Sequence, residues 1–171
     1  MGQLIVKRVN RILSMLFDEM RTLSDDERDL PIRWSVMHMY SSAQLAKLLA
    51  LRRGMDVELA SIAAAIHDIA TVVTKKSEGH AERAEKYVRE AIDRYNNNQW
   101  RGNIPVITEE EEDMIVNAIV QHSDKETYSG DSFVELLKDI DSVDRYLHGI
   151  KSEGAYLERC TRVLQELGVQ V

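Results

Sequence analysis

His67 and Asp68, two adjacent residues that could bind a metal ion, lie in an unusually apolar segment of the sequence. Ten of the twelve residues from Leu59 to Ala70 are apolar or Ser, and a helix this apolar is normally buried. An ionised Asp in a protein core is unfavourable by several kcal/mol unless it is paired or bound to a metal. No Lys or Arg lies within a turn on the N-terminal side of Asp68. A cation is the simplest partner, and a His–Asp hydrogen bond at the helix end is the structural alternative.

Further histidines extend this pair to a larger set. The chain has five histidines, and four of them align with the apolar stripes of four separate predicted helices. Neutral imidazole is the commonest metal ligand, and metal sites in helical bundles form where such ligands converge between helices. Packing alone does not explain four inward-facing histidines. The four are His38, His67, His80 and His122.

The segment 132–149 adds carboxylates to this set. Large apolar residues recur there at helical spacing and predict a buried stripe. Asp141 lies beside that stripe and is the better ligand candidate, whereas Asp144 and Arg145 could form a solvated face.

Seven helical segments can be predicted, with no strand-like alternation, and the fold class is therefore all-α. Asp56 is a predicted N-cap, Gly54 a predicted helix end, and two capping boxes begin at Thr108 and Ser132. The predicted segments are about 3–23, 33–53, a helix after Asp56 that carries 59–70, 79–94, 108–122, 132–149 and 153–167.

Length, charge and cysteine content limit the protein class. The 171 residues fit one domain, 1–171, which can bury a core without disulfides. A formal net charge of −7 argues against the basic face that a nucleic-acid duplex requires. It leaves room for a small anionic substrate, because a bound cation can dominate the local field. The single cysteine, Cys160, excludes an intrachain disulfide and suits a reducing compartment.

Targeting patterns also favour a soluble protein. The first twenty residues are amphipathic and charged, so they lack the uncharged core of a signal peptide. No apolar run approaches the roughly 20 residues that a membrane span requires. We therefore expect a cytoplasmic protein with no membrane partner, while the oligomeric state stays unknown.

In chain order, the candidate ligands resemble the H…HD…H…H…D signature of the HD-domain metalloprotein superfamily. The flanking sequences RWSVMHMYSSAQLAKLLA, ELASIAAAIHDIA, EGHAERAEKYVREAI, IVNAIVQHS and LLKDIDSVDRYL are similar to the segments that carry these residues. The resemblance covers residues 34–148 and implies a compact HD-domain helical bundle with flanking helices at both ends.

The resemblance also implies a set of metal ligands. Asp139 and Asp144 are alternatives to Asp141 for the last ligand of a first ion. A second ion would share Asp68 and use two further histidines, for which His80 and His122 are the matching positions. The implied cofactor is one or two divalent transition-metal ions, Mn, Fe, Ni, Co or Zn, with Mg as a further candidate. The implied ligands of the first ion are His38, His67, Asp68 and Asp141.

The activity implied by the resemblance is hydrolysis of a small phosphorylated substrate, with nucleotides among the candidates. The metal would lower the pKa of a bound water from about 15.7 towards roughly 7, and Asp68 could accept its proton. Many members follow the HD doublet with Ile-Gly-Lys, whereas this chain reads HDIATVVTKK. Candidate phosphate-binding cations, each with plain solvation as its alternative, are Arg33, Lys75, Lys76 and Arg145.

Two other functions use the same ligand set. Some proteins with these ligands are di-iron oxygenases that cleave C–C or C–P bonds. A non-catalytic regulatory or ligand-binding domain would keep the fold and a structural metal without turnover. Retention of every ligand in this chain argues against a decayed site.

Overall fold

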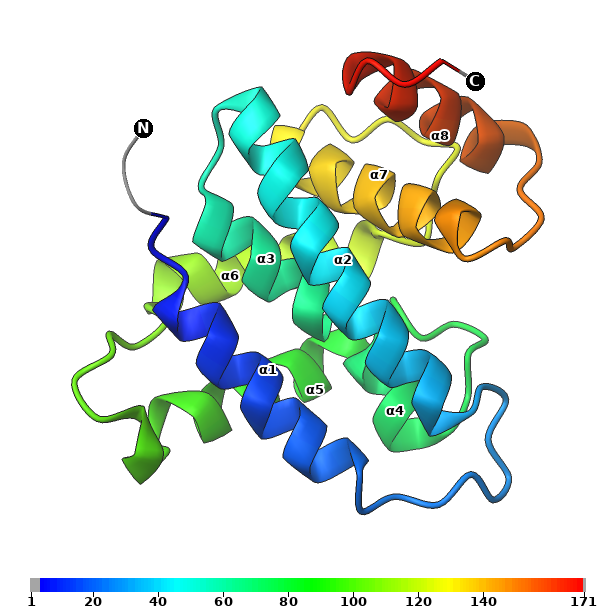
Figure 1. The fold of residues 1–171 in the computed structure, drawn as a ribbon. Helices are drawn as coiled ribbons and strands as arrows, with labels where there is room; N and C mark the ends of the chain where they lie inside the picture. The colour runs from blue at the N-terminus through cyan, green and yellow to red at the C-terminus, as the bar shows by residue number, and fades with distance from the viewer. Residues whose placement is uncertain (1–3, 171) are drawn as a thin grey trace.

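Figure 1 shows a computed structural model of the protein, which describes residues 4–170. Every regular element in that range is helical, so the prediction of an all-α fold is confirmed. The predicted helix start at Gln3 lies outside the described residues. The elements are α1 (Lys7–Met20), α2 (Ile32–Arg53), α3 (Val57–Ile66), α4 (Ile69–Thr74), α5 (Ala84–Asn96), the 3-10 helix η1 (Gln99–Arg101), α6 (Glu109–Gln121), α7 (Ser132–Leu147) and α8 (Gly154–Glu166).

Short-range signals set several helix ends as predicted. The Asp56 side chain accepts a hydrogen bond from the backbone N–H of Leu59 and caps α3. Thr108 and Glu111 form the expected capping box at the start of α6. α2 ends at Gly54, whose left-handed φ of 65° is accessible to glycine with little strain.

One predicted helix cap and one predicted helix start are wrong. The cap of α7 is Asp131 instead of Ser132, because the Asp131 carboxylate accepts bonds from two backbone N–H groups. Glu135, the expected partner in that capping box, instead accepts hydrogen bonds from Ser129. The other helix, α5, begins at Ala84 and not near residue 79, so His80 lies in the turn before it.

The predicted helix that carries residues 59–70 is divided at the His67–Asp68 doublet. Asp68 has φ −97° and ψ 14°, and α4 begins in a new direction after it. This break places the doublet at the junction of two short helices, α3 and α4.

α3 lies at the centre of the fold, packed against α1, α2, α6 and α7 (Figure 1). Nine of its ten residues are buried. α7 packs between α2 and α8, and α5 packs on α6. Because α2, α6 and α7 all pack against α3, side chains at the facing ends of these four helices can converge on one point.

One window, Val57–Thr74, is long and apolar enough to cross a membrane, contrary to the sequence expectation. Buried residues make up 78% of this window, as in the core helix of a soluble protein. It also contains the break at His67–Asp68. A cytoplasmic location stays a prediction.

Candidate metal centre

Four histidines from four segments direct their Nε2 atoms towards one region. In three of them the Nδ1–H group donates to the carbonyl of the third preceding residue: His67 to Ala64 at 2.7 Å, His80 to Ser77 at 2.8 Å and His122 to Ile119 at 2.6 Å. Such a bond orients the ring and leaves Nε2 as the nitrogen with a free lone pair. In the fourth, His38, Nδ1 lies 2.6 Å from Asp144 Oδ2, so its Nε2 also faces the site.

The first group of donor atoms surrounds His38 Nε2. This nitrogen lies 3.1 Å from His67 Nε2, 3.5 Å from Asp68 Oδ2 and 3.2 Å from Asp141 Oδ1. His67 Nε2 lies 3.7 Å from the same Asp141 oxygen. A tetrahedral ion with N and O ligands at roughly 2.1 Å separates those ligands by about 3.4 Å. His38, His67 and Asp68 therefore have the spacing of a metal site, and Asp141 Oδ1 lies beside both histidine nitrogens.

A second group of donors shares Asp68 with the first. His80 Nε2 lies 2.9 Å from Asp68 Oδ1 and 3.1 Å from His122 Nε2. His122 Nε2 lies 3.7 Å from the same Asp68 oxygen. Asp68 thus offers Oδ2 to His38 and Oδ1 to the other pair, as a ligand between two ions would. The six residues predicted as ligands are all brought together.

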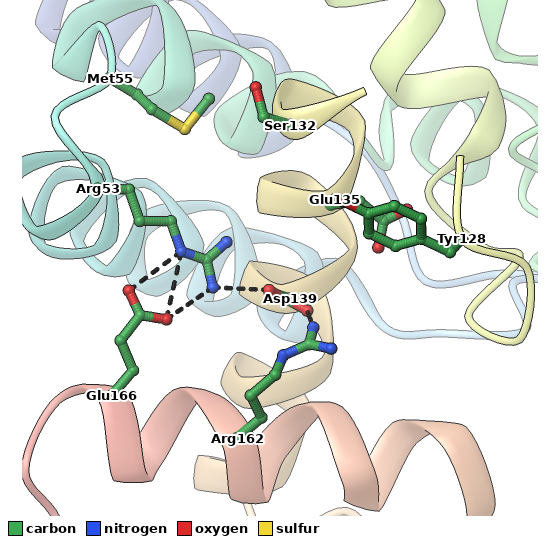
Figure 2. A pocket seen from close by; sticks show the side chains of 8 residues that line it. All are labelled: Arg53, Met55, Tyr128, Ser132, Glu135, Asp139, Arg162 and Glu166. Carbon is green, nitrogen blue, oxygen red and sulfur yellow. Dashed lines mark hydrogen bonds and ion pairs between the residues drawn. The ribbon is translucent and has the colours of Figure 1, made fainter. Parts of the chain in front are cut away.

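Only one of the three candidate aspartates on α7 faces the Nε2 atoms of these histidines. Figure 2 shows the Asp139 carboxylate between Arg53 at 2.7 Å and Arg162 at 2.6 Å, and Arg159 binds it at 2.8 Å. Asp139 therefore pairs with three guanidinium groups, and no contact with the histidines is found in the described residues. Asp144 binds the outer nitrogen of His38, and Asp141 supplies the oxygen next to His38 Nε2.

A family model described as HD domain matches residues 36–148, about two thirds of the chain, and this span includes all six converging residues. This chain belongs to the HD-domain family. No curated protein and no solved structure matches it significantly. The matched region of the HD domain contains α3 to α7 and most of α2, and it ends before α8.

The charges in this HD domain favour a cation between the ligands. Burial opposes ionisation of Asp68, but the neighbouring imidazoles, His67 first and then His122 and His80, hold its pKa well below the usual range. Burial also opposes charge on His38, yet its bonds to Asp141 and Asp144 raise its pKa to about 10. The carboxylates therefore stay ionised and attract positive charge.

The pKa of His122 is shifted in the opposite direction from that of His38. Burial lowers the pKa of its imidazole to about 4, which leaves the ring neutral around pH 7. A neutral ring is the form that binds a metal. At this position the ligand needs no deprotonation before an ion enters.

Asp144, which the sequence left as part of a solvated face, is buried and orients His38. Because such outer carboxylates fix the ring and increase its basicity, their loss typically weakens metal binding by 10–100-fold. We expect Asp144→Ala to lower metal affinity by roughly that factor. Competition with a chromophoric chelator measures it, and a thermal melt shows that the variant is folded. Unchanged affinity in folded Asp144→Ala would refute this role.

Lys125 is a buried cation at the site that the sequence did not reveal. Its Nζ lies 2.7 Å from Asp141 Oδ2 and donates to the His122 carbonyl at 2.6 Å. The lysine therefore engages one Asp141 oxygen and leaves Oδ1 for the histidine side. Its only sequence signal was its place three residues after His122, in a polar loop that gives no indication of burial.

A cavity of about 160 Å³ adjoins the metal centre. Neither Arg33, which is exposed at the start of α2, nor Lys75, which ends α4, lines it. Lys76 pairs with Asp29 at 3.1 Å and is also absent from the lining. The sequence-based assignment of Arg33 and Lys75 to substrate binding therefore finds no support in this arrangement. The cavity is lined by Leu30, Asp68, Thr71, Ser77, His80, Ser123, Asp141, Arg145 and Tyr156.

Arg145 is the cation at this cavity. Its guanidinium has no hydrogen bond or ion pair with any side chain or backbone group in residues 4–170. Thr71 takes the place, three residues after the HD aspartate, where many family members carry Lys. The positive charge therefore reaches the site from α7 and not from the segment after the doublet.

Proposed function

We propose that this HD domain is a metal-dependent phosphohydrolase that acts on a small phosphate ester through one or two divalent transition-metal ions. One observation supports it most. Three of the six converging donors, Asp68, His80 and Asp141, line a cavity that is also lined by Arg145, whose guanidinium has no partner in the described residues. Metal ligands beside a free guanidinium form the combination that binds and polarises a phosphoryl group.

Each side chain then has a definite role. His38, His67, Asp68 and Asp141 hold the first ion, and Asp68, His80 and His122 hold the second. When bound, a divalent ion supplies Lewis acidity and lowers the pKa of water at the site. Asp68 also lines the cavity, and its lowered pKa suits it to hold the ions more than to accept a proton from the attacking water.

Arg145 binds the phosphoryl oxygens in this proposal. A guanidinium forms two parallel hydrogen bonds to such oxygens and stabilises the charge that develops on them. Loss of one donor that stabilises a transition state typically lowers kcat by 10²–10³-fold. We expect Arg145→Gln to lower kcat/KM by about 10²-fold. Arg52→Gln, at an exposed position near the end of α2, is the matched control and should keep full activity. Equal activity of Arg145→Gln and the control would remove Arg145 from the mechanism.

The metal content and the phosphate-release activity of the purified protein test the proposal as a whole. Protein prepared without a chelator or a histidine tag should contain one or two equivalents of a transition metal, and His67→Ala should lose them. Phosphate release from small esters should fall with the metal. Oxygen uptake with an organic substrate, without phosphate release, would instead favour a di-iron oxygenase. Protein that binds no Mn, Fe, Ni or Zn even after reconstitution would be a non-catalytic domain.

A further inference from the structure

One wall of the cavity comes from outside the matched family region. Tyr156 of α8 lines it together with Asp68, Asp141 and Arg145. The family match ends at residue 148, whereas α8 spans residues 154–166. The side chain that limits the space beside the metal centre is therefore supplied by a flanking helix.

Buried contacts fix α8 and thus the position of Tyr156. Arg159, three residues later, donates to the Lys125 carbonyl at 3.0 Å and pairs with Asp139 and Glu135, each at 2.8 Å. Residues three apart share one face of a helix. The Tyr156 ring itself lies 5.4 Å from the Lys125 ammonium, the group that also binds Asp141. The Asp139 cluster of Figure 2 thereby holds the helix that closes the cavity.

The cavity is small for an organic ligand. Its volume is about 160 Å³. Pockets for drug-sized ligands occupy about 300–1,000 Å³. A cavity below that range suits a phosphoryl group on a short alcohol better than a nucleotide.

The lining also lacks a surface for a nucleobase. Leu30 is its one aliphatic side chain, and the aromatic ring of Tyr156 packs near Lys125. The Tyr156 hydroxyl makes no hydrogen bond with any group in the described part of the chain. Tyr156 and Arg145 line the same cavity, so their polar groups suit phosphate oxygens and the hydroxyls of a short alcohol.

We infer that Tyr156 restricts this site to phosphate monoesters of short polar alcohols and excludes nucleotides. The inference rests on the proposed phosphohydrolase function. Tyr156 acts as a specificity residue: it limits the size of the alcohol, and the metal ligands with Arg145 act on the phosphoryl group.

Two phosphomonoesters of different size provide the test, with the full chain loaded with Mn²⁺. Glycerol 1-phosphate and adenosine 5′-monophosphate present the same scissile group on a small and a large alcohol. We expect the wild-type kcat/KM to favour the small ester by at least about tenfold. Tyr156→Ala should lower this ratio at least tenfold by raising activity on the nucleotide. Tyr156→Phe should keep it, because it retains the ring. Leu157→Ala, at an exposed neighbour that does not line the cavity, is the matched control and should also keep the ratio.

Binding provides a readout that does not depend on turnover. Calorimetric titration with inorganic phosphate tests the phosphoryl site, and both esters are then titrated as its competitors. If phosphate binds but the nucleotide competes or reacts as well as the small ester, the size restriction is refuted and the proposed function stands. A ratio that is unchanged in Tyr156→Ala refutes the role of Tyr156 alone. If metal-loaded protein binds no phosphate, the proposed function fails and the inference fails with it.

Discussion

The Asp68→Asn variant should lose about 10³-fold in the rate of phosphate release and most of its bound metal. Asp68 is the one residue that belongs to both donor groups, with Oδ2 3.5 Å from His38 Nε2 and Oδ1 2.9 Å from His80 Nε2. Asparagine keeps the shape but removes the negative charge and one oxygen ligand. A metal contributes several kcal/mol to catalysis, and each 1.36 kcal/mol corresponds to a factor of ten in rate.

Plasma mass spectrometry and phosphate release at saturating Mn²⁺ measure the two effects separately. Asp26→Asn is the matched control, because Asp26 is exposed in the loop before α2 and should leave both values unchanged. A circular dichroism spectrum equal to that of the wild type shows that the helices are intact. Activity of Asp68→Asn within tenfold of the wild type would contradict the role of Asp68 as a ligand shared by two ions.

Asp139→Ala should strongly destabilise the protein without a direct effect on the metal ligands. The buried Asp139 carboxylate binds Arg53, Arg159 and Arg162. Removal of one partner from a buried ion pair typically costs 3–5 kcal/mol, because it leaves uncompensated charge. We expect a loss of about 3 kcal/mol in the free energy of unfolding, since Arg53 and Arg159 keep Glu166 and Glu135 as partners.

For a chain of this length, such a loss lowers the Tm by roughly 10 °C. Thermal and urea unfolding measure it, and Glu166→Ala provides the comparison. Glu166 is partly exposed where it pairs with Arg53, so its removal should cost at most about 1 kcal/mol. Metal content per folded chain should stay unchanged in both variants. Equal stability of the two would show that the buried cluster is not what holds α8.

The sequence by itself determined the helices and the ligand types. Apolar periodicity and capping residues act within one or two turns, so Asp56, Gly54 and the Thr108–Glu111 box marked their helix ends correctly. The apolar segment around His67 and Asp68 also indicated that this polar pair is buried and has no charged partner nearby in the sequence. These signals need no knowledge of what lies across the core.

Long-range packing decided two other features. One is the helix break at His67–Asp68, and the other is which of the α7 aspartates faces the metal site. Asp139, Asp141 and Asp144 all lie near the same buried stripe, and their spacing alone does not separate a metal ligand from a partner of arginines. Their roles follow from what each meets: three guanidinium groups, His38 Nε2 or His38 Nδ1. Those partners lie 20 to more than 100 residues away in the sequence.

Tertiary structure alone also placed Lys125 and Tyr156 around the site, and it selected Arg145 from the four candidate cations of the sequence. Lys125 and Tyr156 look like ordinary solvated residues in the sequence, because their positions depend on segments that pack against them. Lys125 is buried by Asp141 and Tyr156, and Tyr156 reaches the cavity because Arg159 anchors α8 on α7. Local sequence patterns record which face of a helix is apolar, whereas the identity of the group opposite that face depends on long-range packing.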